Sequence, residues 1–348
     1  MKSRLLVLVF ALLLLCPAAF AAESAPATET QPAAAAGPVD LTFLHINDPH
    51  GHTAPYKTEA GKNVGGYARL ATLVEGARQT SRAARVFLIH AGDEFSRGDA
   101  LTESTKGAAN IAIMNQLGFD AWTLGNGDFY GGWPVLKARI GEFKGATLAA
   151  NVVVRDTNEQ VGKPYVILQA GPVKVAFLGL CFLSPMDNSF WTFRVSDAQE
   201  TAEKLVPELR KQADVIVGVT HHGSWLDKRI GSAVEGIDLV IGAHTHQVLE
   251  KGEHAKSPSG RDVLVVQAGE YMQYLGRVDM RVVRTDGVWR VSQSSAMLVP
   301  IDDKIKPDPA TAAFIAKLSQ PGSKALLPTP QPEKSAAEKP AAAAPASK

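Results

Sequence analysis

Six apolar runs divide the central part of the chain, and most of them lead directly into Asp, Asn or His. The runs are short, rich in β-branched residues and nearly continuous, which is typical of strands buried on both faces. In open α/β folds, polar residues at the carboxyl ends of strands build sites at one edge of a sheet. We therefore predict a strand in each of the segments 41–50, 86–93, 122–128, 215–222, 239–246 and 263–269.

Helical patterns separate these predicted strands. Apolar residues recur at helical spacing from Tyr67 to Ala77 and from Ala109 to Leu117. A third helix is predicted from Ala198 to Lys211, with Leu205 and Leu209 directed inward. Alternation of strands and helices predicts βαβ units and a largely parallel core.

The pattern changes after Gly276. A strand beginning at Val278 runs into the pair Asp286-Gly287, and a second strand follows from Val288. An Asp-Gly pair between two such runs predicts an antiparallel hairpin. We therefore expect an α/β fold, arranged as a two-sheet α/β sandwich in a single domain.

The N-terminus has the features of a secretory signal peptide. Lys2 and Arg4 precede an apolar run at 5–15, and small residues follow, so we expect a signal peptide at 1–21. The apolar run is too short to cross a bilayer comfortably, so no transmembrane segment is expected after cleavage. Lipid attachment at Cys16 is the weaker alternative. The protein is expected to be periplasmic or secreted.

Composition delimits the folded part of the 348-residue chain. Residues 22–38 and 319–348 are rich in Ala and Pro and have no periodic apolar face, so we expect a linker, a domain at 39–318 and a disordered tail. After signal cleavage Cys181 would be the remaining cysteine, most simply a buried apolar residue. The formal net charge is +1 and there is no basic stripe, so nucleic-acid binding by the scaffold is not indicated.

The polar residues at the strand ends are metal ligands by type. Carboxylate, amide and imidazole groups together favour Mn, Fe, Zn or Co over Ca or Mg. Each of the pairs Asp48/His50 and His244/His246 alternates in sequence, so its two members are expected to point to the same side of an extended strand. A carboxylate such as Asp93 can bridge two cations about 3.5–4 Å apart. The residues predicted to bind two divalent ions are Asp48, His50, Asp93, Asn126, His221, His244 and His246.

These residues carry a family resemblance. From about Asp40 to Leu318 the chain resembles the metallophosphoesterase domain of the 5′-nucleotidase family, in which relatives include 2′,3′-cyclic-nucleotide phosphodiesterases and a sulfur-oxidation thiosulfohydrolase. The resemblance implies a metallophosphoesterase-type two-sheet α/β sandwich. It rests on the motifs at 47–52, 65–70, 91–93, 105–118, 124–126, 150–152, 220–223 and 242–246.

The resemblance also assigns the ligands to two ions. It implies that Asp48, His50 and His246 bind the first metal, that Asn126, His221 and His244 bind the second, and that Asp93 bridges them. A metal-bridging hydroxide would then be the nucleophile in an exported hydrolase of phosphate esters.

The chain departs from the family after Asn126. The family has a His and an Asp here that act on the transition state and the leaving group, whereas this sequence has Gly127 at the His position. His52, His222 and Asp128 are the nearest substitutes, each with a simpler structural role as the alternative. We also expect no C-terminal nucleotide-binding domain of the kind found in the family, and no substrate-binding residue is identified.

Three functional hypotheses follow. The first is the dinuclear-metal phosphoesterase, acting on a small phosphoester or related substrate. The second is a catalytically impaired metal-binding pseudoenzyme, favoured by Gly127. The third is a thiosulfohydrolase-like protein acting with a protein partner, which the sequence does not identify.

Overall fold

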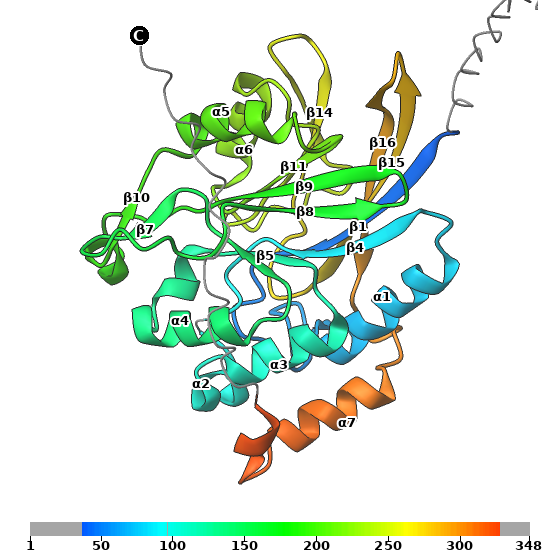
Figure 1. The fold of residues 1–348 in the computed structure, drawn as a ribbon. Helices are drawn as coiled ribbons and strands as arrows, with labels where there is room; N and C mark the ends of the chain where they lie inside the picture. Colours follow the sequence, from blue (N-terminus) through cyan, green and yellow to red (C-terminus); the bar gives the residue numbers. More distant parts are fainter. Residues whose placement is uncertain (1–36, 96, 328–348) are drawn as a thin grey trace, which may run out of the picture. The chain divides into compact units, whose positions relative to one another are not determined.

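The computed structural model describes residues 37–95 and 97–327 (Figure 1). Within them the chain forms two six-stranded sheets that pack against each other. The expected signal peptide, nearly all of the linker at 22–38 and the tail beyond 327 lie outside the described residues.

The first sheet has the strand order β16-β15-β1-β4-β5-β6. Its strands β1, β4, β5 and β6 are parallel, and the long β15–β16 hairpin joins antiparallel at β1. The strands are β1 (Val39–Ile46), β4 (Arg85–His90), β5 (Ala121–Thr123), β6 (Ala146–Leu148), β15 (Tyr274–Thr285) and β16 (Val288–Pro300).

The second sheet has the order β13-β14-β12-β11-β9-β8. Its four central strands are parallel, and the two edge strands are antiparallel. The strands are β8 (Tyr165–Ala170), β9 (Val173–Leu180), β11 (Val215–Thr220), β12 (Leu239–Ile241), β13 (Glu253–Lys256) and β14 (Asp262–Val266). Two small ribbons lie outside the main sheets: β2 (Tyr56–Lys57) with β3 (Asn63–Val64), and β7 (Val152–Val154) with β10 (Phe193–Val195).

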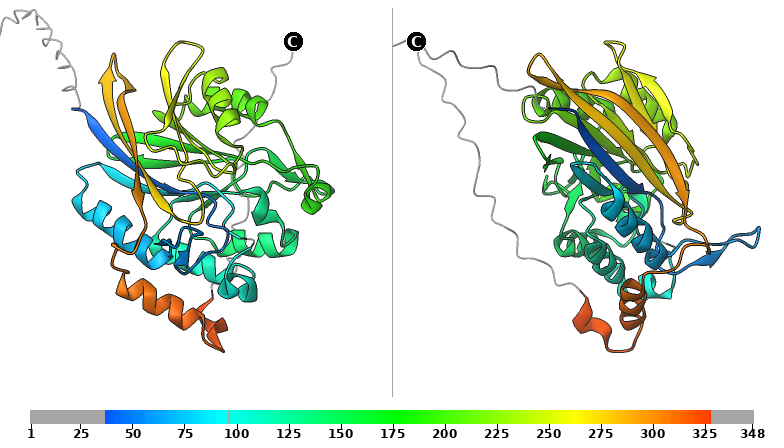
Figure 2. Two further views of the ribbon diagram at one scale, coloured as in Figure 1. Left: turned by 180° about the vertical axis from the view of Figure 1, so that it is seen from behind. Right: turned by 90° about the vertical axis from the view of Figure 1, so that its right-hand side faces the viewer.

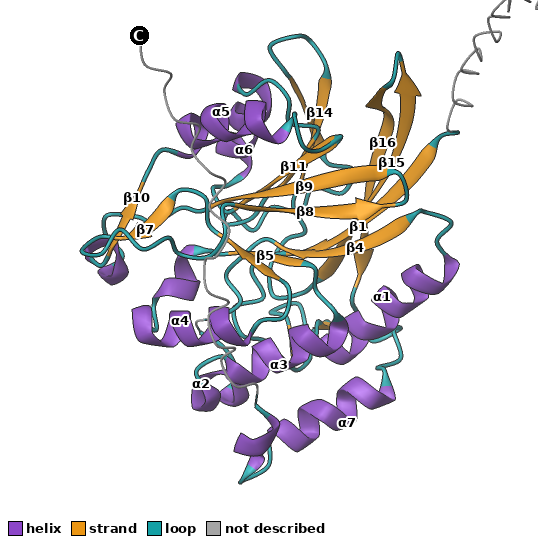
Figure 3. Ribbon diagram, viewed as in Figure 1, coloured by secondary structure: helices purple, strands orange, loops and turns teal. Residues whose placement is uncertain are grey.

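Helices cover the outer faces of the two sheets, as Figures 2 and 3 show. Apolar residues of α1 and α3 pack on the first sheet, and those of α5 and α6 pack on the second. The α-helices are α1 (Tyr67–Thr80), α2 (Ala100–Thr105), α3 (Ala108–Leu117), α4 (Trp133–Glu142), α5 (Ala198–Leu209), α6 (Ser224–Ala233) and α7 (Pro309–Leu318). Short 3₁₀ turns are η1 (Asn126–Phe129), η2 (Asn188–Trp191) and η3 (Ser323–Leu326).

Aromatic rings fill the space between the sheets. Phe43 of β1 and Phe87 of β4 stack with ring centroids 5.3 Å apart, and Phe177 of β9 meets Phe87 edge-on at 5.1 Å. All three rings are buried. Their contact joins the first sheet to the second, so the α/β sandwich predicted from the sequence is confirmed.

Two local predictions need correction. Neither ligand pair lies on an extended strand. Because β1 ends at Ile46 and β12 ends at Ile241, Asp48 and His50 lie in the loop after β1, and His244 and His246 lie in the loop after β12. In α5, Leu209 is buried as predicted, but Leu205 is only half-buried and the neighbouring Val206 is buried. The hairpin is confirmed: Thr285 pairs with Val288, and both turn residues have positive φ.

Among the described residues, no helix combines the length and the apolar character needed to span a bilayer.

Candidate metal centre

All seven predicted ligands meet at one edge of the sandwich, where parallel strands of both sheets end. In the first sheet, Asp48 and His50 follow β1, Asp93 follows β4, and Asn126 opens η1 after β5. In the second, His221 follows β11, and His244 and His246 follow β12. The site therefore lies at the carboxyl ends of strands, where open α/β sheets place their ligands.

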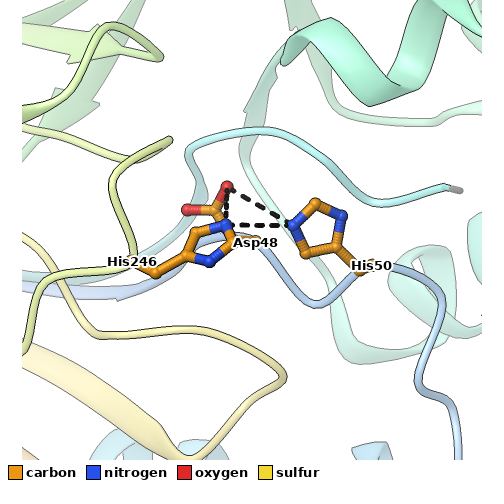
Figure 4. A group of neighbouring side chains, drawn as sticks. All are labelled: Asp48, His50 and His246. Carbon is orange, nitrogen blue, oxygen red and sulfur yellow. Dashed lines mark hydrogen bonds and ion pairs between the residues drawn. The ribbon is translucent and has the colours of Figure 1, made fainter. Parts of the chain in front are cut away.

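Asp48, His50 and His246 form the first group of possible ligands (Figure 4). The Nε2 atoms of His50 and His246 are 3.1 Å apart. From Asp48 Oδ1 the distance is 3.4 Å to His246 Nε2 and 3.9 Å to His50 Nε2. One cation could contact all three side chains.

A second group of possible ligands, Asp48, Asp93 and His221, lies beside the first and shares the Asp48 carboxylate with it. His221 Nε2 is 3.4 Å from Asp93 Oδ1, and His244 Nδ1 is 3.0 Å from Asn126 Oδ1. The rings of His221 and His244 are 5.2 Å apart between centroids. The other oxygen of Asp93, Oδ2, lies 3.8 Å from His50 Nε2. The two oxygens of Asp93 thus face different groups, as a bridging carboxylate requires.

The hydrogen bonding of the site supports a cation. Asp48 Oδ1 and His221 Nε2 are buried, 3.7 Å apart, and have no hydrogen-bond partner. Buried polar atoms without partners are rare because each costs about 1–3 kcal/mol. With metal–ligand bonds of about 2.1 Å, neighbouring ligand atoms lie about 3.0–3.4 Å apart. Several of the separations in the site are close to this range, so the residues fit a metal ion.

The charges in the site act on one another. Burial opposes a charge on His221, but the carboxylates of Asp93 and Asp48 outweigh it and raise the pKa of His221 to about 10. Burial would raise the pKa of Asp48, yet His221 and His246 hold it below its ordinary value. The carboxylates therefore stabilise positive charge at the position where a cation would bind.

The close packing of the loops demands glycine at two positions. A Cβ atom on Gly92, whose φ is 105°, would lie 2.6 Å from His221 Nδ1. A Cβ atom on Gly125 would collide with Asp93 Oδ1. These glycines let the backbone approach the carboxylate and the imidazole directly.

Several supporting residues were not predicted from the sequence. Glu270 Oε2 lies 2.6 Å from His246 Nδ1, and such a carboxylate orients a ligand histidine. Asn126 Nδ2 donates to the Tyr130 hydroxyl at 2.8 Å, and this hydroxyl donates to Asp187 at 3.0 Å. These two hydrogen bonds orient the side-chain amide of Asn126 so that its oxygen faces His244. Glu270 directly follows the apolar run at 263–269, which was the available signal.

The three weaker catalytic candidates have other surroundings. Each oxygen of Asp128 accepts two backbone N–H bonds, so this side chain holds the loop after β4 to Gly125. His52 contacts the Pro49 carbonyl at 3.0 Å and packs against tyrosine rings. His222 lies 6.2 Å from the Phe182 ring, and burial, with the charges of His221 and His244, lowers its pKa to about 3.

Comparison with known proteins supports this description. Residues 41–248 match the family model of the calcineurin-like phosphoesterases. The trifunctional nucleotide phosphoesterase protein YfkN of Bacillus subtilis (strain 168) is 29% identical over 78% of this chain and 20% of its own length. A probable 5′-nucleotidase of Treponema pallidum (strain Nichols) is 31% identical over 72% of this chain and 46% of its own. The chain thus spans half or less of the length of these relatives.

A solved structure agrees. The 5′-nucleotidase precursor of Thermus thermophilus superposes with a TM-score of 0.73 and 26% identity, covering 81% of this chain and 59% of that one.

Proposed function

Since the chain belongs to the calcineurin-like phosphoesterase family, we propose that it is an exported hydrolase of phosphate esters that works with two divalent metal ions. The observation that carries the proposal is the convergence of the seven predicted ligand side chains at one sheet edge, where Asp48 Oδ1 and His221 Nε2 are buried without hydrogen-bond partners.

The residues have distinct tasks in this proposal. Asp48, His50 and His246 would hold one ion, Asn126, His221 and His244 the other, with Asp93 between them. Divalent ions, when bound, would neutralise phosphoryl oxygens and lower the pKa of an attacking water. The protein fixes the geometry: the backbone N–H of His244 donates to Asp48 Oδ2 at 2.9 Å, and the backbone N–H of Gly127 donates to Asp93 Oδ1 at 2.6 Å.

The substrate class is a small phosphoester. Relatives named as 5′-nucleotidases and as a nucleotide phosphoesterase favour nucleotides, and with them a role in nucleotide catabolism. The metals would be Mn, Zn, Fe or Co, because imidazole and carboxylate ligands suit these ions.

A second candidate is a metal-binding pseudoenzyme, and one observation favours it. Gly127 has no side chain beside the Asp93 carboxylate that its N–H contacts, so it offers no proton donor to a leaving group. A general acid typically contributes about 10²–10⁴ in rate.

The experiment combines metal analysis with turnover. The purified protein is loaded with Mn, its metal content is measured, and chromogenic phosphate mono- and diesters are assayed. Two metals per chain and turnover that is lost in Asp93→Ala, but kept in the exposed control Asp156→Ala, would support the hydrolase. Two metals without turnover on any ester would support the pseudoenzyme. A protein that binds no metal would contradict both.

A further inference from the structure

A cavity of about 290 Å³ opens beside Gly127. Phe95 and Val135 supply apolar walls, and the Tyr130 ring, Arg97, Lys106 and Glu103 also line the cavity. Such a lining suits a compact organic group that carries negative charge on one side.

The cavity adjoins the metal centre through two of its lining residues. Gly127 N–H donates to Asp93 Oδ1 at 2.6 Å. The Tyr130 hydroxyl accepts from Asn126 Nδ2 at 2.8 Å. A substrate held at Asp93 and Asn126 could therefore extend directly into this space.

Arg97 is held at the cavity by its backbone. Its φ is 57°, an uncommon conformation for a residue other than glycine. The next residue, Gly98, packs so closely that a Cβ atom there would lie 2.7 Å from the Gly51 carbonyl oxygen. The side chain of Asp99 then accepts a hydrogen bond from the backbone N–H of Thr53 at 2.8 Å. The loop that carries Arg97 is thus anchored to the loop that carries His50.

We propose that this cavity is the leaving-group subsite of the phosphoesterase and that Arg97 stabilises the negative charge that develops on the leaving oxygen. The inference rests on the proposed function. In hydrolysis, water gives up a proton to solvent and adds its oxygen to phosphorus, and the bond to the leaving oxygen breaks. The electron pair stays on that oxygen, which takes a proton from solvent. A guanidinium beside it neutralises the charge before the proton arrives.

The subsite also limits the substrate. A space of about 290 Å³ lies at the lower end of ligand pockets, which span about 300–1,000 Å³. It accommodates a single ring or a short polar chain. The part of the leaving group next to the leaving oxygen is thus compact, and the rest of a larger leaving group, such as the base of a nucleotide, would lie outside the cavity.

Binding is tested with two phosphonates that cannot be hydrolysed at the P–C bond. Phenylphosphonate has a ring in the leaving-group position and methylphosphonate does not. Val135→Phe should fill the cavity from α4, weakening phenylphosphonate binding to the Mn-loaded protein about tenfold and leaving methylphosphonate unchanged. Equal effects on both ligands, or none, would overturn the subsite.

The role of Arg97 is tested by turnover of esters with poor and good leaving groups. Arg97→Gln should lower kcat about 10- to 100-fold for phenyl phosphate, less than the roughly 10²–10³ of an enclosed donor because Arg97 is exposed. The loss should be smaller for 4-nitrophenyl phosphate, and Arg97→Lys should restore part of it. The exposed control Arg290→Gln should have no effect. Equal losses for both esters would overturn the role of Arg97.

The two proposals fail separately. A wild-type protein that hydrolyses no ester defeats the proposed function, and the phosphonate comparison still decides the subsite. Normal turnover with no selective loss in Val135→Phe and Arg97→Gln defeats the subsite alone.

Discussion

Replacement of Glu94 should destabilise the fold by removing a buried acceptor under the metal-binding loop. Glu94 Oε2 accepts hydrogen bonds from the Tyr67 hydroxyl at 2.5 Å and from His90 Nε2 at 2.7 Å. Its Oε1 accepts from Asn110 Nδ2 at 2.7 Å. His90 Nδ1 already accepts from Gly92 N–H at 2.9 Å, so its proton must be on Nε2. All four side chains are buried.

The size of the effect follows from these contacts. Glu94→Ala leaves three buried donors without an acceptor, each worth about 1–3 kcal/mol. Partial relaxation and entry of water reduce the sum, so we expect a loss of about 3–5 kcal/mol in the free energy of unfolding. That is a large part of the stability of an ordinary domain, about 5–15 kcal/mol.

Glu94→Gln is the matched control. The glutamine oxygen can still accept from Tyr67 and His90, and its amide can donate to Asn110 Oδ1, which is buried and has no partner. That contact requires the Asn110 amide to turn over, which leaves its nitrogen unsatisfied instead of its oxygen. Because one donor is left without a partner, we expect a loss of about 1–2 kcal/mol.

The assay is urea unfolding of the metal-free protein in chelator, so that metal binding adds no stability. The midpoint should fall for both variants at constant slope, and much further for Glu94→Ala. If alanine and glutamine cost the same, or both cost less than about 1 kcal/mol, the reasoning from unsatisfied donors is refuted.

Three further predictions concern the metal centre. Glu270→Gln should weaken metal binding about 10-fold or more, measured by titration, because His246 loses the carboxylate that orients it; unchanged affinity would contradict this role. In the metal-free protein the raised pKa of His221, about 10 against an ordinary 6.5, gives stability that is complete below pH 6.5 and lost as pH rises through 10. A cation must displace this proton, so metal affinity should rise about tenfold per pH unit between pH 6.5 and pH 10, with proton release in an unbuffered titration. A metal affinity that does not change with pH would contradict this prediction. Tyr130→Phe should reduce affinity for the second metal about 10-fold by freeing the Asn126 amide to turn, with the first metal unaffected.

Much of the fold could be predicted because its signals are local. The run at Val215–Thr220 is apolar throughout, and β11 is buried along its whole length. The pair Asp286-Gly287 adopts positive φ at both positions, as its residue types predict. The expectation that strand ends meet at one edge followed from parallel pairing, and it brought Asp48 and His244 together although they are far apart in sequence.

The rest depended on contacts that no short segment contains. Glu270 is adjacent to His246 only because β14 pairs with β12. Asp128 stands beside a ligand-bearing turn in the sequence, but its role was decided by four N–H groups that converge on it. Whether Arg97 lies at the cavity likewise depends on the packing of Gly98 on Gly51.

The backbone conformation of the loops explains why the ligands lie so close together. The sequence did not predict this conformation. Asp48, His50, Asp93, His244 and His246 all have φ between 47° and 79°, a region that residues other than glycine rarely adopt. Such conformations cost of order 1–3 kcal/mol each and persist where the surrounding structure enforces them. These turns allow Asp48 and His50, and likewise His244 and His246, to reach one site although the members of each pair are only two residues apart. The loops therefore have strained backbone and hold the carboxylates of Asp48 and Asp93, which repel each other, close together. A bound cation would relieve this repulsion. Metal should stabilise this fold as well as serve its chemistry, so removal by chelator is expected to lower Tm reversibly.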